Sequence, residues 1–162
     1  MLFKVRALGA ILLLAACDPP HDAGLGPYPV KEQPANGSRC YLRRTLNPPM
    51  IADADTFPGT PDSLYIRLDV VGELANGVYD WIPGEKDSKT GTFTGTLENG
   101  LVTALYTYEA EGMTAKEEVL FKIEPDGLRI GSGELMESEG IWLFKDKSKA
   151  EFGPLVQAVA CK

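Results

Sequence analysis

Histidine is nearly absent from this chain of 162 residues, which contains only His21. That scarcity excludes most catalytic triads and His-rich metal sites, and no metal or cofactor is predicted. Positive charge is also scarce, because 16 Lys and Arg residues face 23 Asp and Glu residues, for a formal net charge of -7. With no basic excess to neutralise phosphates, nucleic acid is not an expected partner. Cysteine is limited to three residues, an odd number, so at least one thiol has no intrachain partner.

The first sixteen residues have the organisation of an export signal. Lys4 and Arg6 precede a ten-residue apolar run, residues 7–16. A helix needs about 20 residues to cross a bilayer, so this run is typical of a signal peptide. The run ends in Leu14-Ala15-Ala16-Cys17, which resembles the lipobox of bacterial lipoproteins. The resemblance implies cleavage before Cys17 and acylation of its thiol, the alternative being an ordinary secretory signal with a chance cysteine.

A lipidated Cys17 would place the mature chain at a lipid bilayer of the bacterial cell envelope, facing the periplasm. In enterobacterial lipoproteins an Asp after the lipidated Cys acts as an inner-membrane retention signal. Asp18 therefore favours the inner membrane, with the outer membrane as the alternative. Residues 17–37 are rich in Pro and Gly and predict an extended tether, which contains His21. Loss of Lys4 and Arg6 would take the net charge from -7 to -9.

The two other cysteines, Cys40 and Cys161, lie near the two ends of the remaining domain, residues 38–162. Two thiols in an oxidising compartment are expected to pair, with two free thiols as the alternative. A disulfide between them predicts that the first and last strands of the domain are neighbours.

Residues 38–162 show the alternation of apolar and polar residues that is typical of β-strands, interrupted by Gly at short intervals. Asn76-Gly77 and Asn99-Gly100 are strong signals for two-residue hairpin turns, and Pro125-Asp126 predicts a third hairpin. The pattern gives about eight or nine strands and a Pro-rich loop or lid over residues 47–62. Such strands cannot bury both faces as a flat sheet. We predict an all-β fold, a small antiparallel up-and-down barrel, with a β-sandwich as the alternative.

The barrel resembles the calycin, or lipocalin-like, shape in outline only. The G-x-W motif of lipocalins is absent, because Cys40-Tyr41-Leu42 occupies the first strand. A narrower resemblance rests on Tyr79-x-Trp81-x-Pro83-x-Glu85-Lys86-Asp87 and on the Gly and Tyr residues that follow it. These motifs, over roughly residues 64–136, are similar to a group of small bacterial lipoproteins to which no activity is assigned, so the resemblance implies no function.

The predicted registers place a set of candidate ligand-binding side chains inside the barrel. Four of them are aromatic: Tyr79, Trp81, Phe93 and Tyr106. If the third hairpin keeps its register, Glu117 lies opposite Glu134 on the same face, beside Tyr106. Two like charges there would have to reach water, share a proton or bind a cationic group. A one-residue bulge near Gly131 or Gly133 is the alternative, and it would turn Glu134 outward.

No catalytic constellation is recognisable, and the leading hypothesis is a non-enzymatic binding module. It predicts a membrane-anchored envelope lipoprotein whose barrel holds a small, partly apolar ligand. The alternative is an interaction or inhibitor lipoprotein that presents loops to an envelope protein. An exposed Trp142 and Phe144 would form one such surface, the alternative for this pair being packing beneath the strands of Cys40 and Cys161. A third hypothesis, an enzyme based on carboxylates, requires Glu117 and Glu134 to share an open pocket.

Overall fold

A computed structural model describes residues 36–52 and 55–161 of the chain. The predicted signal peptide over residues 1–16, Cys17, Asp18 and nearly all of the tether lie outside these residues, so the expectations about them stay predictions. Within the described part, no helix is long and apolar enough to cross a bilayer. Strands dominate this part: β1 (Gly37–Leu46), β2 (Met50–Ala52), β3 (Asp55–Phe57), β4 (Pro61–Val71), β5 (Leu74–Ile82), β6 (Lys89–Glu98), β7 (Leu101–Ala110), β8 (Met113–Glu124), β9 (Gly127–Ser132), β10 (Leu135–Ser138), β11 (Ile141–Phe144), the 3-10 turn η1 (Lys147–Lys149), β12 (Glu151–Phe152) and β13 (Val156–Val159).

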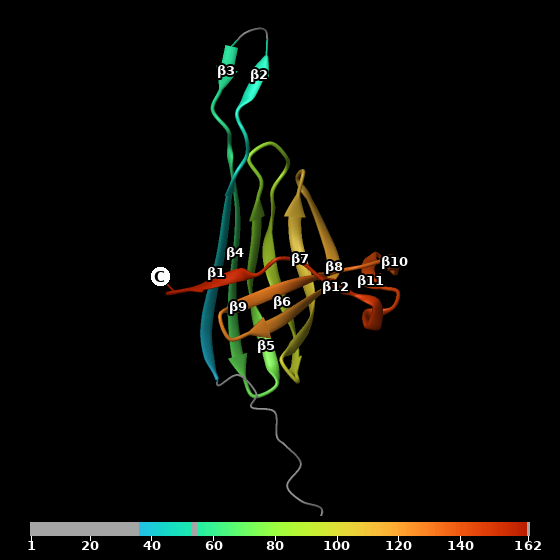
Figure 1. Ribbon diagram of the computed structural model, residues 1–162. Coiled ribbons are helices and arrows are strands. Elements are labelled where there is room, and N and C mark those ends of the chain that lie inside the picture. The colour runs from blue at the N-terminus through green and yellow to red at the C-terminus, as the bar shows by residue number, and fades with distance from the viewer. Residues whose placement is uncertain (1–35, 53–54, 162) are drawn as a thin grey trace, which may run out of the picture. The chain divides into compact units, whose positions relative to one another are not determined.

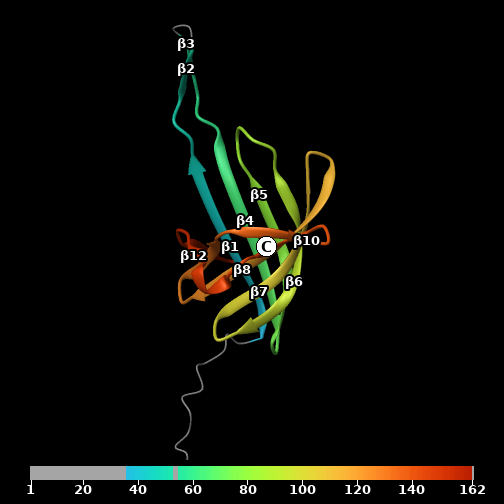
Figure 2. The ribbon, with the colours of Figure 1, turned by 90° about the vertical axis from the view of Figure 1, so that its right-hand side faces the viewer.

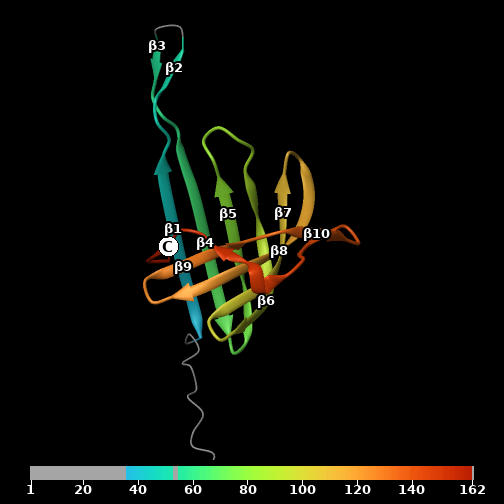
Figure 3. The same ribbon diagram turned by 45° about the vertical axis from the view of Figure 1, so that its right-hand side comes forward.

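Eight of these strands close into an antiparallel barrel, which confirms the predicted all-β architecture. Around the barrel they follow the order β1-β4-β5-β6-β7-β8-β9-β13, and β13 pairs again with β1. Neighbours in this cycle follow the chain, except that β2 and β3 are inserted between β1 and β4, and β10, β11 and β12 between β9 and β13. Figures 1 and 3 show β9 and the C-terminal strand crossing in front of β4 and β5 at a steep angle. Closure leaves these eight strands without a free sheet edge.

The barrel has a turn end and a mouth end. The turn end carries the short connections β4–β5, β6–β7 and β8–β9, and β1 begins there, because Gly37 pairs with Val70. At the mouth end are the loop between β5 and β6 and the two short strands β2 and β3, which continue beyond β1 and β4 (Figure 2). The region expected to be a Pro-rich loop or lid therefore contains a short hairpin.

The hairpin at Asn99-Gly100 forms as predicted. Phe93 pairs with Tyr106 and Leu97 with Val102 across β6 and β7. Asn99 and Gly100 both have positive φ, 51° and 80°, which a tight turn of this kind requires. The threonines between the inward residues face solvent, also as expected: Thr92, Thr94 and Thr96.

The hairpin predicted at Asn76-Gly77 was wrong in position. The chain turns at Gly72, whose φ is 61°, and Glu73, so Asn76 and Gly77 lie inside β5. A side chain at Gly77 would collide with the Arg67 carbonyl and with the ring of Phe93, which explains why glycine stands in this strand. The partner of Tyr79 moves from Leu74 to Ile66, an even number of residues. Because successive side chains alternate between the two faces of a strand, a shift by an even number of residues leaves Tyr79 on its predicted face.

The third hairpin is correct near its turn and wrong beyond it. Ile123 pairs with Leu128 and Phe121 with Ile130, in the predicted register. The strand expected over residues 128–136 then separates from β8 and divides into β9 and β10. Strand β11 takes the vacated place, parallel to β8, with Trp142 beside Glu117. The predicted pairing of Glu117 with Glu134 therefore does not form.

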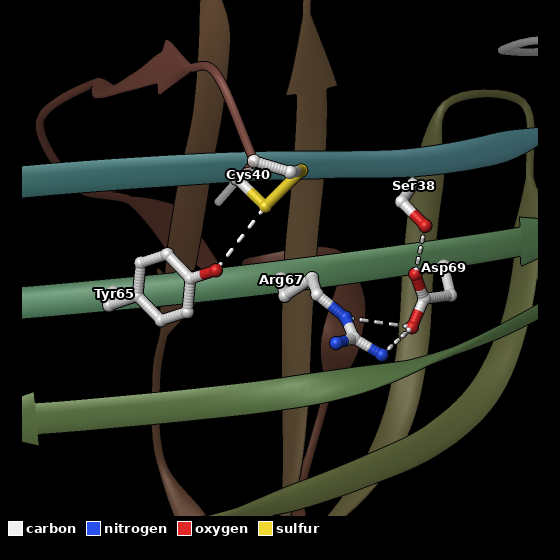
Figure 4. Close-up of a disulfide and its surroundings, with 6 residues drawn as sticks. Ser38, Cys40, Tyr65, Arg67 and Asp69 are labelled. Carbon is white, nitrogen blue, oxygen red and sulfur yellow. Dashed lines mark hydrogen bonds and ion pairs between the residues drawn. A yellow bond between two sulfur atoms is a disulfide. The ribbon is translucent and has the colours of Figure 1, made fainter.

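Strands β1 and β13 are neighbours, as predicted from the cysteines at the two ends of the domain. Tyr41 pairs with Ala158, and Cys40 and Cys161 lie at disulfide distance, with Cα atoms 5.1 Å apart (Figure 4). The Sγ atom of Cys40 also lies 3.3 Å from the hydroxyl of Tyr65 on β4. The link joins residues 121 positions apart, a loop that the chain-entropy model values at roughly 4–5 kcal/mol.

Candidate functional site

A pocket of about 320 Å³ opens on the inner face of the barrel near the mouth end, and we call it the mouth pocket. Cross-strand partners share a face of the sheet, so the ladder shows which side chains point inward. Arg43 on β1 pairs with buried Leu64 on β4, and Lys89 on β6 pairs with Trp81 on β5. The residues that line the pocket come from seven segments: Arg43, Leu64, Tyr79, Trp81, Lys89, Glu117, Ile130, Gly131, Ser132, Gly153 and Pro154.

Aromatic side chains fill the barrel below the pocket. The ring centroids of Tyr79 and Tyr106 are 4.9 Å apart, and those of Phe93 and Phe121 are 5.0 Å apart. Tyr106 also stacks on Tyr108 at 4.9 Å. Phe93 and Tyr106 have only 1% and 0% of their surface exposed, so they form the packed floor and do not reach the pocket.

Glu117 lies at the side of the mouth pocket in contact with two polar groups. Its Oε2 atom accepts a hydrogen bond from the Tyr108 hydroxyl at 3.3 Å and lies 3.4 Å from Nζ of Lys89. The same ammonium lies 4.6 Å from the centre of the Tyr108 ring, at the distance of a cation–π contact. Burial lowers the pKa of Lys89, but Glu117 and Tyr108 outweigh it, and the net effect raises this pKa. Lys89 is therefore charged and is already partnered by a carboxylate.

Tyr79 in the pocket wall and Tyr106 in the floor stay protonated near neutral pH. The Tyr106 hydroxyl donates a 2.7 Å hydrogen bond to the main-chain carbonyl of Tyr79. Burial, with smaller contributions from neighbouring groups, raises the pKa of Tyr106. Burial and the charge of Glu117 raise the pKa of Tyr79 to about 12, against the opposing effect of Arg43. Tyr79 thus presents a neutral hydroxyl that can donate a hydrogen bond.

Glu134, predicted to face Glu117, lies outside the mouth pocket. It falls between β9 and β10, its side chain is 73% exposed, and its Oε1 atom pairs with Nζ of Lys145 at 2.8 Å. Strand β9 has ended at Ser132, and Gly133 packs against the ring of Phe144. The paired carboxylates that the enzyme hypothesis required are not brought together. Of the six predicted ligand residues, Tyr79, Trp81 and Glu117 line the pocket, whereas Phe93 and Tyr106 lie beneath it.

Sequence reasoning missed the two cations of the pocket, Arg43 and Lys89. Both could have been found from the alternation of strand residues. Tyr41 is buried, so Arg43, two positions later on β1, has the same facing. Lys89 likewise precedes inward-facing Phe93 by four positions on β6.

Trp142 and Phe144 behave differently from each other on β11. Phe144 is buried, with 9% of its surface exposed, whereas Trp142 is 44% exposed. Strand β11 is held to the barrel by Glu118, which accepts a hydrogen bond from the Phe144 main-chain N–H and pairs with Lys147. Trp142 is therefore a partly exposed side chain on a strand that is bound to the barrel.

In the described part of the chain, no group of three or more His, Cys, Asp or Glu side chains could hold a metal ion. Comparison with family models, with curated proteins and with solved structures gives no significant match.

Proposed function

We propose that this chain is a membrane-anchored lipoprotein of the bacterial cell envelope that binds a small, partly apolar ligand in the mouth pocket without chemical turnover. The single observation that supports binding is the pocket itself. Its volume of about 320 Å³ lies at the low end of the range for small-molecule sites. Its walls combine apolar side chains with a few polar groups, which is the usual composition of such sites.

The position of the pocket suits a protein tethered at its N-terminus. Strand β1 begins at the turn end with Gly37, and Arg43 reaches the mouth pocket six residues later. At about 3.3 Å per residue, this places the pocket roughly 20 Å along the barrel from the end of the tether. An anchor at Cys17 would thus be attached at the end of the barrel that lies away from the pocket. The negative net charge of the chain also opposes close contact with anionic headgroups.

Native mass spectrometry of the full chain, extracted from bacterial membranes in a non-ionic detergent, tests this function. We expect one or a few bound small molecules of defined mass, released on denaturation. Ser132→Trp should displace them, because Ser132 is exposed and lines the pocket. Ser138→Trp, at an exposed position on β10, is the matched control. A parent chain without a bound molecule, or equal occupancy in both variants, would contradict the proposal.

A second candidate function is docking of an envelope protein at β11, favoured by the exposure of Trp142. The neighbouring strand β10 ends the sheet, and the main-chain groups of an edge strand can pair with another chain. A photo-crosslinking amino acid in place of Trp142 should then give one discrete adduct in living cells. The same amino acid at Thr94, exposed on β6, should give none. Equal crosslinking at both positions would remove this candidate.

A further inference from the structure

The mouth pocket has a positive charge balance in a chain whose net charge is -7. Its lining contains two cations, Arg43 and Lys89, and one carboxylate, Glu117. Glu117 lies 3.4 Å from Lys89 and compensates it. Among the side chains that the structure describes, Arg43 forms no ion pair and no hydrogen bond. Among the described residues, one positive charge of the pocket is therefore left without a partner.

Arg43 faces the barrel interior next to apolar and aromatic side chains. Its cross-strand partner is Leu64, which is 4% exposed, and Tyr79 and Trp81 belong to the same wall. Tyr79 is close enough for the guanidinium to affect its ionisation. A guanidinium remains charged at any physiological pH, so this position attracts an anion. The neutral Tyr79 hydroxyl can donate a hydrogen bond to the same group.

The apolar and the charged parts of the pocket lining together restrict the chemical class of the ligand. Leu64, Trp81 and Ile130 supply apolar surface for the body of a ligand. One unpaired guanidinium balances one negative charge, and its planar fork matches a carboxylate in bidentate geometry. We infer that the mouth pocket takes an amphipathic monocarboxylate, with Arg43 bound to the carboxylate and the apolar body against Trp81. This inference rests on the proposed binding function and adds the chemical class of the ligand.

Three probes with the same phenylalkyl body and different head groups test the inference: phenylbutyrate, phenylbutanol and phenylbutylamine. The full chain is kept in a non-ionic detergent, and binding is followed by NMR of the tryptophan indole N–H signals. Trp81 lines the pocket and Trp142 does not, and Trp142→Phe assigns the two signals. We expect both compounds to shift the Trp81 signal. From these shifts, the affinity for phenylbutyrate should be at least about tenfold higher than that for phenylbutanol, a factor that corresponds to about 1.4 kcal/mol. The amine should bind more weakly still, because it meets Arg43.

Arg43→Gln should reduce phenylbutyrate affinity at least about tenfold and leave phenylbutanol affinity unchanged. Arg44→Gln is the matched control, because Arg44 is the adjacent residue and its side chain is exposed. If Arg43→Gln does not fold, Arg43→Lys keeps the charge, and loss of the fork should weaken carboxylate binding by a smaller factor. Equal affinities for phenylbutyrate and phenylbutanol, no shift with phenylbutyrate, or equal effects at Arg43 and Arg44 would each overturn the inference.

The outcomes also separate this inference from the proposed function. A neutral or cationic molecule that co-purifies in the mouth pocket would overturn the carboxylate class while supporting ligand binding. A chain that purifies with no bound molecule would contradict the proposed function itself.

Discussion

Tyr106 on β7 is the cross-strand partner of Glu117 on β8, so a fully buried phenol and a pocket carboxylate are directly adjacent on the inner face. The phenol forms part of the floor, and the carboxylate lies at the side of the pocket, 18% exposed and in contact with Lys89 and Tyr108. A charged carboxylate at this depth is tolerated because both neighbours donate to it. Removal of its charge should therefore change anion binding in the pocket more than the stability of the fold.

Glu117→Gln is expected to strengthen the binding of anions in the mouth pocket. The substitution keeps the shape of the side chain and leaves Lys89 as a second uncompensated cation. The stability cost should be at most about 1 kcal/mol, because Lys89 is partly exposed and such pairs contribute little. Calorimetric titration with phenylbutyrate, together with urea unfolding, measures both quantities. Glu109→Gln, at an exposed position on β7, is the control, and weaker anion binding by Glu117→Gln would contradict the charge assignment.

The folded chain should lose stability at alkaline pH through Tyr79. Burial and Glu117 raise the Tyr79 pKa from 10.0 to about 12, so the folded state keeps its proton while the unfolded state loses it. The stabilisation is thus complete below about pH 10 and is lost as pH rises toward 12. In this window each such tyrosine adds a slope of about -1.4 kcal/mol per pH unit to the free energy of unfolding.

Urea unfolding at several pH values, for the parent and for Tyr79→Phe, measures this contribution as the difference between two slopes. Groups that do not interact with Tyr79 titrate alike in both proteins and cancel in the comparison. Tyr106 does not cancel fully, because Tyr79 contributes, after burial, to its raised pKa. Phenylalanine preserves the ring contacts with Tyr106 and Phe121. Parallel slopes for the two proteins would show that the Tyr79 hydroxyl ionises equally in the folded and unfolded states.

Local alternation in the sequence was sufficient to predict which side chains face inward. Tyr79 and Trp81 were placed on the correct face although the turn before them was misplaced, because an even shift of register preserves facing. The same argument, applied to β1 and β6, would have found Arg43 and Lys89. The barrel closure was predictable because the cysteines mark the first and last strands, and Cys40 and Cys161 do lie together.

Non-local competition for a strand edge was not predictable in this way. Glu134 follows the alternation of β9. The neighbouring Gly131 and Gly133 indicated a bulge as the alternative, but not that the strand ends at Ser132. The edge of β8 is taken by β11, whose parallel pairing has no local turn signal. The contact of Glu118 with the Phe144 main-chain N–H, which holds β11 in place, joins residues 26 positions apart. Correct placement of Glu134 would have required this long-range contact to be known.

Gly77→Ala should destabilise the barrel, although Asn76-Gly77 is not a turn. A methyl group at this position would meet the Arg67 carbonyl on one side and the Phe93 ring on the other. Relief of this overlap has to move β4 or the packed floor, and overpacking of this kind typically costs about 1–3 kcal/mol. Gly153→Ala is the matched control, because the nearest atom to its added methyl group is 3.7 Å away. Urea unfolding of both variants checks this, and equal stabilities would place Gly77 outside the packed region.

The three cysteines should divide into two independent roles, an anchor and a link between the ends of the domain. Cys40→Ser is expected to lower the free energy of unfolding by up to roughly 4–5 kcal/mol, because it frees two ends of the chain 121 residues apart. Cys17→Ser should leave that free energy unchanged and abolish incorporation of a fatty-acid analogue in growing cells. Denaturant unfolding and metabolic labelling of both variants measure the two roles. Acylation that persists in Cys17→Ser would contradict the lipoprotein assignment, whereas unfolding of Cys40→Ser at the parent's urea midpoint would contradict a stabilising disulfide.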